Sequence, residues 1–269
     1  MISRDRSAPI GVFDSGLGGL TVAHAIMRQL PNESLVYFGD TARVPYGPKS
    51  PETVQRYSRE IATFLIEQGV KVIIVACNTA TAHALPMLQA EFDLPVIGVI
   101  GPGARAAVRA TRNQRIGVIG TDGTVRSGAY VRAIEEESPS ARVTALSCPL
   151  FVPLVEEGWT EHAATRLVAA EYLEGMQAAE VDTLVLGCTH YPLLKPLLAE
   201  IMGPGVTLID SAEETARDLQ SMLAQRNFGN RRADPEYRFF ASDDAAKFLA
   251  LGQRFLGDAI ERVEIRTFS

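Results

Sequence analysis

The sequence predicts an α/β protein with two similar domains, each a mainly parallel sheet flanked by helices. Short continuous apolar runs alternate with amphipathic stretches, as expected when crossover helices cover both faces of parallel strands. An Ile-Gly-Val strand opening into a glycine turn occurs twice, at Ile10 and Ile116. A strand ending in a small residue and a cysteine also occurs twice, at Cys77 and Cys188. The pairs keep their order and nearly the same separation, which indicates pseudo-symmetric halves.

The expected strands are runs rich in valine, isoleucine and leucine, bounded by turn residues. In chain order they are Ile10–Phe13, Leu35–Phe38, Val72–Val75, Val96–Val99, Ile116–Ile119, Val143–Leu146, Thr183–Leu186 and Val206–Ile209. Helical patterns lie between them, for example at Pro51–Gln68 and Thr160–Gln177. Near the end, a polar loop "RNFGNRRADPEYR" precedes two further expected strands, in "RFFAS" and "RVEIRTF". This alternation predicts parallel sheets with right-handed crossovers.

Composition excludes several classes of protein. Of 269 residues, 46% are hydrophobic and 22% charged, which is typical of a globular protein with an ample core. The net charge of −6 offers no basic field for nucleic acid or an anionic membrane. No run is long enough to span a bilayer, and "MISRDRSAP" lacks the apolar stretch of a secretory signal, so we expect a cytoplasmic protein. Three widely spaced cysteines do not form a disulfide framework.

The two repeated cysteines predict proton-transfer chemistry. Open parallel sheets bind ligands at the carboxyl ends of their strands, where Cys77 and Cys188 both lie. If the halves face each other, both thiols point into one cleft between them. Each cysteine closes a strand before an expected helix start, which favours the thiolate. Two thiols on opposite faces of one carbon can remove a proton and return another, which inverts a stereocentre. Cys148 lacks this context, and we expect a buried small side chain there.

Other chemistries remain open from the residues alone. Asp14, Cys77, Cys188 and His190 could hold zinc, although no close ligand spacing supports a metal. Cys188 and His190 could form a nucleophile pair, which leaves Cys77 without a task.

The first glycine turn could also bind a ligand without catalysis. Gly16, Gly18 and Gly19 follow a strand, and Asp40 ends the next strand, as in dinucleotide sites. Thr21 breaks that fingerprint, and the three glycines are equally compatible with a tight turn. A pyridoxal route would need a pocket lysine. Only Lys49 lies near a motif, and the thiol pair makes a cofactor unnecessary.

Five motifs together resemble a known family. They are "IGVFDSGLGGLTV", "YFGDTARVPYG", "ACNTATA", "VPLVEEG" and "GCTHYPLL", between Ile10 and about Ala216. The set is similar to the bacterial glutamate racemases of the aspartate/glutamate racemase family. The resemblance implies interconversion of L- and D-glutamate without a cofactor or metal, supplying D-glutamate for peptidoglycan. Asp14-Ser15 and Cys188-Thr189-His190 favour glutamate over aspartate, since aspartate racemases differ at the corresponding motifs.

The resemblance also implies roles for individual residues. Cys77 would take the α-proton from D-glutamate and Cys188 from L-glutamate. Asp14 would support Cys77, and His190 would support Cys188 together with Glu156 of "PLVE", although neighbouring Glu157 is an alternative. The substrate-contacting positions would be Asp14, Ser15, Pro45, Tyr46, Gly47, Asn78, Thr79, Thr189 and His190.

Purely structural roles are also open for these positions. Asp14 and Ser15 could cap a helix at Leu17. Tyr46 could lie in an ordinary turn, Glu156 could be a surface acid, and His190 could be a core histidine.

The family pattern implies the domain boundaries. Residues 1–98 and 209–269 would form the first domain, with Cys77, because "TLIDSAEETARDL" resembles the strand and helix that return to it. Residues 99–208 would form the second domain, with Cys188. The family often dimerises, so a homodimer is an expectation. Arg43 is the only arginine in the motifs, so we expect hydroxyls and helix-start N–H groups to hold the substrate carboxylates.

Overall fold

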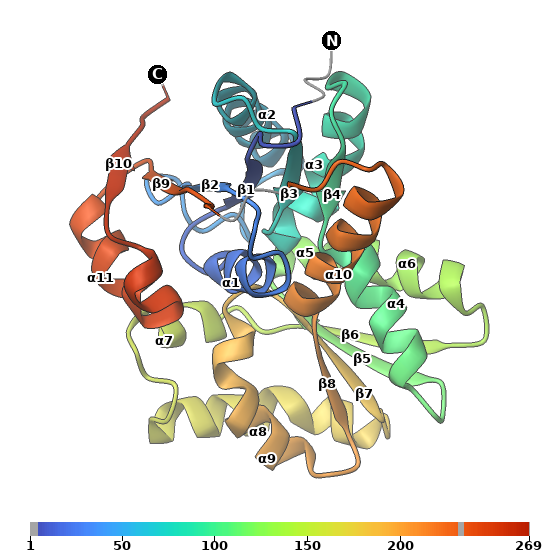
Figure 1. The fold of residues 1–269 in the computed structure, drawn as a ribbon. Coiled ribbons are helices and arrows are strands. Elements are labelled where there is room, and N and C mark those ends of the chain that lie inside the picture. The colour runs from blue at the N-terminus through green and yellow to red at the C-terminus, as the bar shows by residue number, and fades with distance from the viewer. Residues whose placement is uncertain (1–4, 231–233, 269) are drawn as a thin grey trace. The chain divides into compact units, whose positions relative to one another are not determined.

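The computed structural model describes residues 5–230 and 234–268, which form two compact units (Figure 1). Unit 1 combines Met1–Val99 with Ala212–Ser269, and unit 2 is the continuous segment Ile100–Ser211. Residues 231–233 of the expected polar loop, and residues 1–4 of the N-terminal stretch, lie outside the described residues. Among the described residues, no helix is both long and apolar enough to cross a membrane.

Within the described residues, unit 1 holds a six-stranded parallel sheet in the order β10-β9-β2-β1-β3-β4. Its strands are β1 (Ile10–Asp14), β2 (Leu35–Gly39), β3 (Val72–Val75), β4 (Val96–Gly98), β9 (Tyr237–Ala241) and β10 (Val263–Ile265). Its helices are α1 (Leu20–Gln29), α2 (Pro51–Glu67), α3 (Asn78–Glu91), α10 (Ser211–Gln225, with Ser211 still in unit 2), α11 (Ala245–Leu256) and the 3₁₀ helix η2 (Gly257–Ala259). Strands β2, β3 and β4 are apolar, as expected where helices cover both faces of the sheet, whereas the late strands β9 and β10 also carry Arg238 and Glu264.

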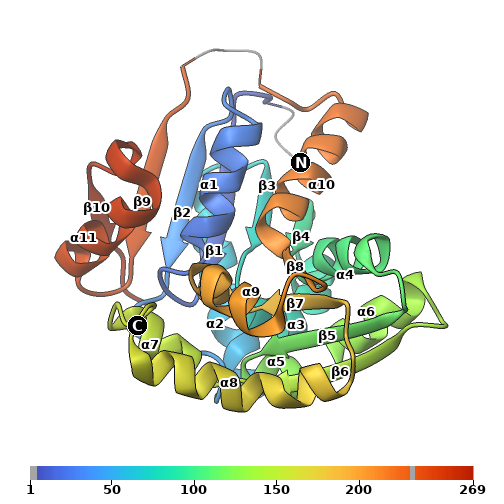
Figure 2. The same ribbon diagram turned by 90° about the horizontal axis from the view of Figure 1, so that it is seen from below.

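Alternate side chains of these strands enter two separate cores. Val12 and Tyr37 pack with residues of α1, α10 and α11 on one face. Phe13 and Phe38 pack with residues of α2 and α3 on the other. Figure 2 shows α1 in front of β1 and β2, with α2 and α3 behind the sheet. Successive side chains of a strand point to opposite faces of the sheet, and here both faces are covered by helices.

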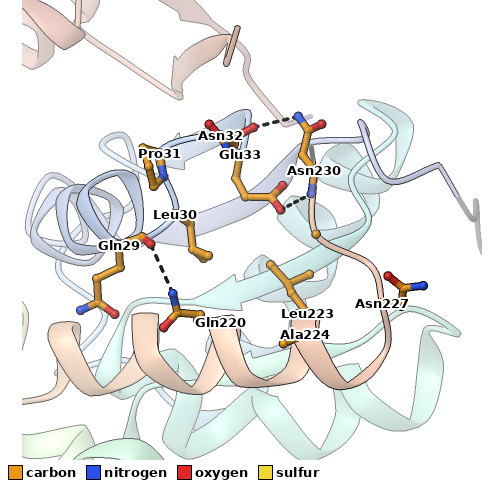
Figure 3. Close-up of a pocket in the computed structure, with 11 residues that line it drawn as sticks. Gln29, Leu30, Pro31, Asn32, Glu33, Gln220, Leu223, Ala224, Asn227 and Asn230 are labelled. Atoms are coloured by element: carbon orange, nitrogen blue, oxygen red, sulfur yellow. Dashed lines mark hydrogen bonds between the residues drawn. The ribbon is translucent and has the colours of Figure 1, made fainter. Parts of the chain in front are cut away.

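The returning helix α10 meets the turn between α1 and β2 in unit 1 (Figure 3). Gln220 of α10 donates to the carbonyl of Gln29 at 3.5 Å. The Asn230 backbone N–H donates to Glu33 Oε1 at 2.7 Å, and its side-chain amide donates to the Asn32 carbonyl at 2.8 Å. These bonds join the first and last parts of unit 1 around an open pocket of about 370 Å³.

Unit 2 holds a four-stranded parallel sheet in the order β6-β5-β7-β8, counted over the described residues. Its strands are β5 (Arg115–Gly120), β6 (Arg142–Ser147), β7 (Thr183–Gly187) and β8 (Thr207–Asp210). Its helices are α4 (Ile100–Ala110), α5 (Asp122–Arg126), α6 (Ala129–Glu137), α7 (Phe151–Glu156), α8 (Ala163–Ala178), α9 (Lys195–Met202) and the 3₁₀ helix η1 (Tyr191–Leu194). The order matches β2-β1-β3-β4 of unit 1, so the two units share a four-strand topology.

The expected strands are confirmed, with end differences of one to two residues in most of them, and so is the α/β fold with two parallel sheets. The expected helix at Thr160 begins later, at Ala163, where His162 accepts a hydrogen bond from the Ala164 N–H. The expectation of a helix directly after Cys188 is wrong. A four-residue 3₁₀ helix follows instead, and α9 begins only at Lys195. Pro196 has no N–H to donate four residues back, which disfavours one continuous α-helix here.

Candidate functional site

The site residues of unit 1 gather at the carboxyl ends of β1 and β3, and we call them the Cys77 half-site. They are Asp14, Ser15, Cys77, Asn78 and Thr79, all buried. Because β1 and β3 are paired neighbours, the residues that follow them emerge side by side. The Cys77 sulfur lies 3.7 Å from Ser15 Oγ.

Cys77 is also the N-cap of α3, a helix of 14 residues. The Ala80 N–H donates to its sulfur at 3.4 Å. Helix N-terminal N–H groups carry partial positive charge, so this position stabilises a thiolate relative to a thiol. Asn78 and Thr79 lie in the first turn of the same helix, and the N-terminal end of a helix favours negative charge.

The glycine turn after β1 is shaped by close packing. Helix α1 begins at Leu20, with Gly19 at its N-cap and no side-chain cap, so the alternative that Asp14 or Ser15 caps this helix is wrong. Asp14 Oδ2 instead accepts from the Gly16 N–H at 3.0 Å. A Cβ at Gly19 would lie 2.5 Å from Asp14 Cβ, which only glycine avoids. The turn therefore presses directly against Asp14.

Tyr37 of β2 contacts this turn, although the sequence motifs did not mark it as a site residue. Its hydroxyl donates to the Gly16 carbonyl at 2.9 Å. Burial raises the pKa of Tyr37 well above its ordinary value, and the charges of Asp14 and Cys77 raise it further. The phenol is thus a neutral donor that senses the charges of Asp14 and Cys77.

The "PYG" loop lies between β2 and α2. Tyr46 is buried, and its hydroxyl donates to Asp40 in a short hydrogen bond. Burial raises the pKa of Tyr46, followed by the charge of Asp40, and Cys77 also contributes. This coupling places Tyr46 within electrostatic reach of Cys77, while its hydroxyl is directed at Asp40.

The site residues of unit 2 lie after β7, and we call them the Cys188 half-site. Cys188, Thr189 and His190 are buried. The Cys188 sulfur lies 3.8 Å from His190 Nδ1. His190 Nε2 lies 3.2 Å from Glu156 Oε1 at the end of α7, and the Glu156 side chain is 39% exposed. Glu156 is therefore the acid that meets His190, through a contact between segments far apart in the sequence.

Cys148 also lies in unit 2, at the end of β6. It is fully buried, and burial together with the charge of Cys188 raises its pKa to about 12. The Tyr191 hydroxyl donates to the Cys148 carbonyl at 2.8 Å. Burial raises the pKa of Tyr191 well above its ordinary value, and the charges of Cys188 and Cys148 add to this. Cys148 thus remains a neutral thiol near Cys188.

Among residues 5–230 and 234–268, no three His, Cys, Asp or Glu side chains gather in a way that could hold a metal ion. Lys71 lies in a buried ion pair with Glu33 at 2.6 Å, and Lys195 pairs with Asp210 at 3.0 Å. The glycine turn that raised the dinucleotide alternative is filled by Asp14 and the Tyr37 hydroxyl.

The fold and the two cysteine half-sites define an amino-acid racemase of a known class. The Asp/Glu/Hydantoin racemase family matches residues 10–219, and the chain belongs to this family. Its relatives are more specific. The glutamate racemase of Geobacter metallireducens is 55% identical over 249 residues, 92% of each chain.

Solved structures agree with this relationship. Glutamate racemase isoform RacE1 from Bacillus anthracis superposes with a TM-score of 0.94 at 41% identity, covering 98% of each chain. The glutamate racemase from Francisella tularensis, solved in complex with D-glutamate, gives a TM-score of 0.92 at 41% identity, also over 98% of each chain.

Proposed function

We propose that this chain is a glutamate racemase that interconverts L- and D-glutamate by a two-thiol mechanism without a cofactor. The observation that carries the proposal is the equivalent position of Cys77, two residues after β3 ends at Val75, and Cys188, one residue after β7 ends at Gly187, in sheets of matching strand order. Each thiol has its own polar support, as a proton-transfer group requires. The glutamate racemases at up to 55% identity over most of the chain support the choice of substrate.

The proposed reaction is a balanced proton exchange at the α-carbon. The Cys77 thiolate takes the α-proton of D-glutamate, and the Cys188 thiol gives its proton to the opposite face, which yields L-glutamate. Cys77 is then a thiol and Cys188 a thiolate, which is the state that L-glutamate needs for the reverse reaction. The mechanism requires both sulfurs to reach one α-carbon.

The supporting groups differ between the half-sites in this proposal. Glu156 accepts the Nε2–H of His190, which leaves Nδ1 of a neutral imidazole as an acceptor facing Cys188. When Cys188 must act as the base on L-glutamate, His190 can hold the thiol proton as an imidazolium beside the thiolate. In the opposite direction the proton stays on the Cys188 sulfur until it is delivered to the α-carbon. In the other half-site, Asp14 fixes the turn through the Gly16 N–H, and Ser15 contacts the Cys77 sulfur.

We further propose that hydroxyl, amide and backbone groups hold the two substrate carboxylates. The N-terminus of α3 offers N–H donors beside Cys77. The Tyr46 phenol is committed to Asp40, so the loop would meet substrate through its backbone. The proposed contacts are Asp14, Ser15, Pro45, Tyr46, Gly47, Asn78, Thr79, Thr189 and His190.

Circular dichroism of pure L- and D-glutamate tests the activity. We expect either enantiomer to lose its optical signal with reduced enzyme, and solvent deuterium to enter the α-carbon. Dialysis against a chelator should leave the rate unchanged. Aspartate, under the same conditions, should react far more slowly. Unchanged signals from both glutamate enantiomers would refute the proposal, and faster turnover of aspartate would reassign the substrate.

The product has a clear use in a bacterium. We propose that the enzyme acts in the cytoplasm and supplies D-glutamate for peptidoglycan. Deletion in the source bacterium should then create a requirement for D-glutamate, unless a second enzyme supplies it. A homodimer stays a prediction.

A further inference from the structure

The loop between β2 and α2 begins with a carboxylate that is completely buried. Asp40 has no exposed surface, and its backbone N–H donates to the Asp14 carbonyl at 3.1 Å. The loop is thus attached at its start to the residue that ends β1. A buried carboxylate is tolerated only when hydrogen-bond donors contact its oxygens. The donors to Asp40 therefore show which parts of the chain this residue links.

Three donors from two chain segments meet on this carboxylate. Arg43 Nε donates to Oδ2 at 2.7 Å, and the Tyr46 hydroxyl donates to the same oxygen. The Ser242 hydroxyl, just after β9, donates to Oδ1 at 2.8 Å and accepts from the Ala42 N–H at 2.8 Å. Asp40 therefore bonds Arg43 and Tyr46 directly and is linked to Ala42 through Ser242, which ties the loop segment 42–46 to the returning part of unit 1.

Arg43 extends this network to α2 and the C-terminal segment. Its Nη1 forms a short ion pair with Glu60 of α2. Its guanidinium carbon lies 3.9 Å from the centroid of the Tyr57 ring and 5.0 Å from that of Phe268. Burial lowers the pKa of Arg43, but Glu60, Asp40 and Tyr46 outweigh burial and raise it. The guanidinium is permanently charged. Its Nε and Nη1 are bonded to Asp40 and Glu60, whereas its buried Nη2 has no hydrogen-bond partner within the described residues.

Phe268 completes the arrangement from the end of the chain. Its ring contacts Phe38 of β2 at 5.3 Å and Phe64 of α2 at 6.4 Å between centroids. A planar guanidinium group can stack on an aromatic ring while its N–H groups donate to several acceptors. The single ammonium group of lysine cannot do both. Arg43 is thus held between rings while it holds Asp40.

We propose that Asp40 and Arg43 are positioning residues that hold the loop carrying Pro45, Tyr46 and Gly47 in its substrate-binding shape, with Phe268 as their support. The inference rests on the proposed function, which places those three residues at the substrate. Arg43 acts through Asp40 and Tyr46 and does not contact glutamate. Loosening the network therefore weakens substrate binding in ground and transition state alike, which raises KM and spares kcat.

The test compares Arg43→Lys with Arg59→Lys. Arg59 lies on α2 of the same unit and pairs with Glu91 at 2.8 Å on the exposed surface, away from the loop. We expect Arg43→Lys to raise KM for both enantiomers about tenfold with kcat within about threefold of the unmodified enzyme, and Arg59→Lys to stay within about twofold. Amide exchange of segment 41–49 should accelerate only in Arg43→Lys.

Two variants of Phe268 test the same inference if Arg43→Lys fails to fold. Phe268→Ala should raise KM about threefold, and Phe268→Tyr, which keeps the ring, should restore it. KM and loop exchange that match the Arg59→Lys control, or a loss confined to kcat, would overturn the inference. Failure of the unmodified enzyme to racemise glutamate would instead refute the proposed function, since the exchange comparison needs no turnover.

Discussion

The two half-sites place a thiol at the same topological position and support it by different means. Cys77 caps a 14-residue helix, and a backbone N–H donates to its sulfur. Cys188 is followed by a four-residue 3₁₀ helix, and its nearest polar partner is the imidazole of His190. In the proposed mechanism, Cys77 is supported by fixed backbone dipoles and the Ser15 hydroxyl, and Cys188 by an imidazole, a group that can gain and lose a proton. The thiol has the same place in both sheets, and the groups that contact it differ.

A second pair of equivalent positions, two strands away from each cysteine strand, has diverged as well. The Asp40 N–H donates to the Asp14 carbonyl at 3.1 Å in unit 1, and the Cys148 N–H donates to the Gly120 carbonyl at 2.8 Å in unit 2. Asp40 and Cys148 are therefore equivalent positions, after β2 and β6. One carries a buried carboxylate that anchors a loop, and the other carries a neutral buried thiol.

Removal of either thiol should have the largest effect. We expect Cys77→Ala and Cys188→Ala each to lower racemisation about 1,000-fold or more, since each removes a general acid–base group. The loss should be equal for both enantiomers in kcat/KM, because L- and D-glutamate have the same free energy. Initial rates by circular dichroism give this comparison. Full turnover by either variant would remove the two-thiol mechanism.

The supporting groups should differ in importance. His190→Asn removes a titrating partner of Cys188, and we expect kcat/KM to fall about 100-fold. Ser15→Ala removes one hydroxyl at 3.7 Å from Cys77, while the Ala80 N–H remains, so the expected loss is about tenfold. The reverse ranking, measured in the same assay, would show that the backbone support of Cys77 is insufficient.

Glu156 offers a finer test of the Cys188 half-site. Glu156→Gln keeps a side-chain oxygen near His190 Nε2 but removes the charge. Because the carboxylate is 39% exposed and screened by solvent, we expect a loss of only about fivefold in kcat/KM. Glu157→Gln is the matched control, and its activity should stay within about twofold. Equal losses in the two variants would argue against the contact with His190.

Cys148 should matter least. Its pKa of about 12, raised by burial and then by Cys188, lies above the usual value of a thiol, so the thiolate is scarce at pH 8 and appears only in strong alkali. We expect iodoacetamide at pH 8 to modify Cys148 more slowly than Cys77 and Cys188, as measured by peptide mass spectrometry. Cys148→Ala should keep racemisation within about threefold, since it removes only a buried side chain. Alkylation of Cys148 at the rate of Cys188 would contradict this assignment.

The sequence predicts the strands and the two cysteine positions well, because continuous apolar runs and repeated strand ends are local signals. The contact between Glu156 and His190 depends on the packing of α7 near the end of β7, so the sequence could not separate Glu156 from Glu157 except through the family motif. Asp40 was visible only as a weak dinucleotide signal, and Arg43 only as a lone arginine. Their shared role depends on Ser242 and Phe268, which come from the far end of the chain.

The placement of β9 has a consequence for the chain as it is synthesised. Strand β2 pairs with β1 on one side and with β9 on the other, but all of unit 2 separates β2 from β9 in sequence. Until Tyr237–Ala241 leaves the ribosome, the outer edge of β2 presents unpaired N–H and C=O groups, a template for wrong association. The same late segment delivers Ser242 to Asp40. A nascent chain therefore pairs the outer edge of β2 and bonds Ser242 to Asp40 in one late event, before Phe268 joins the network.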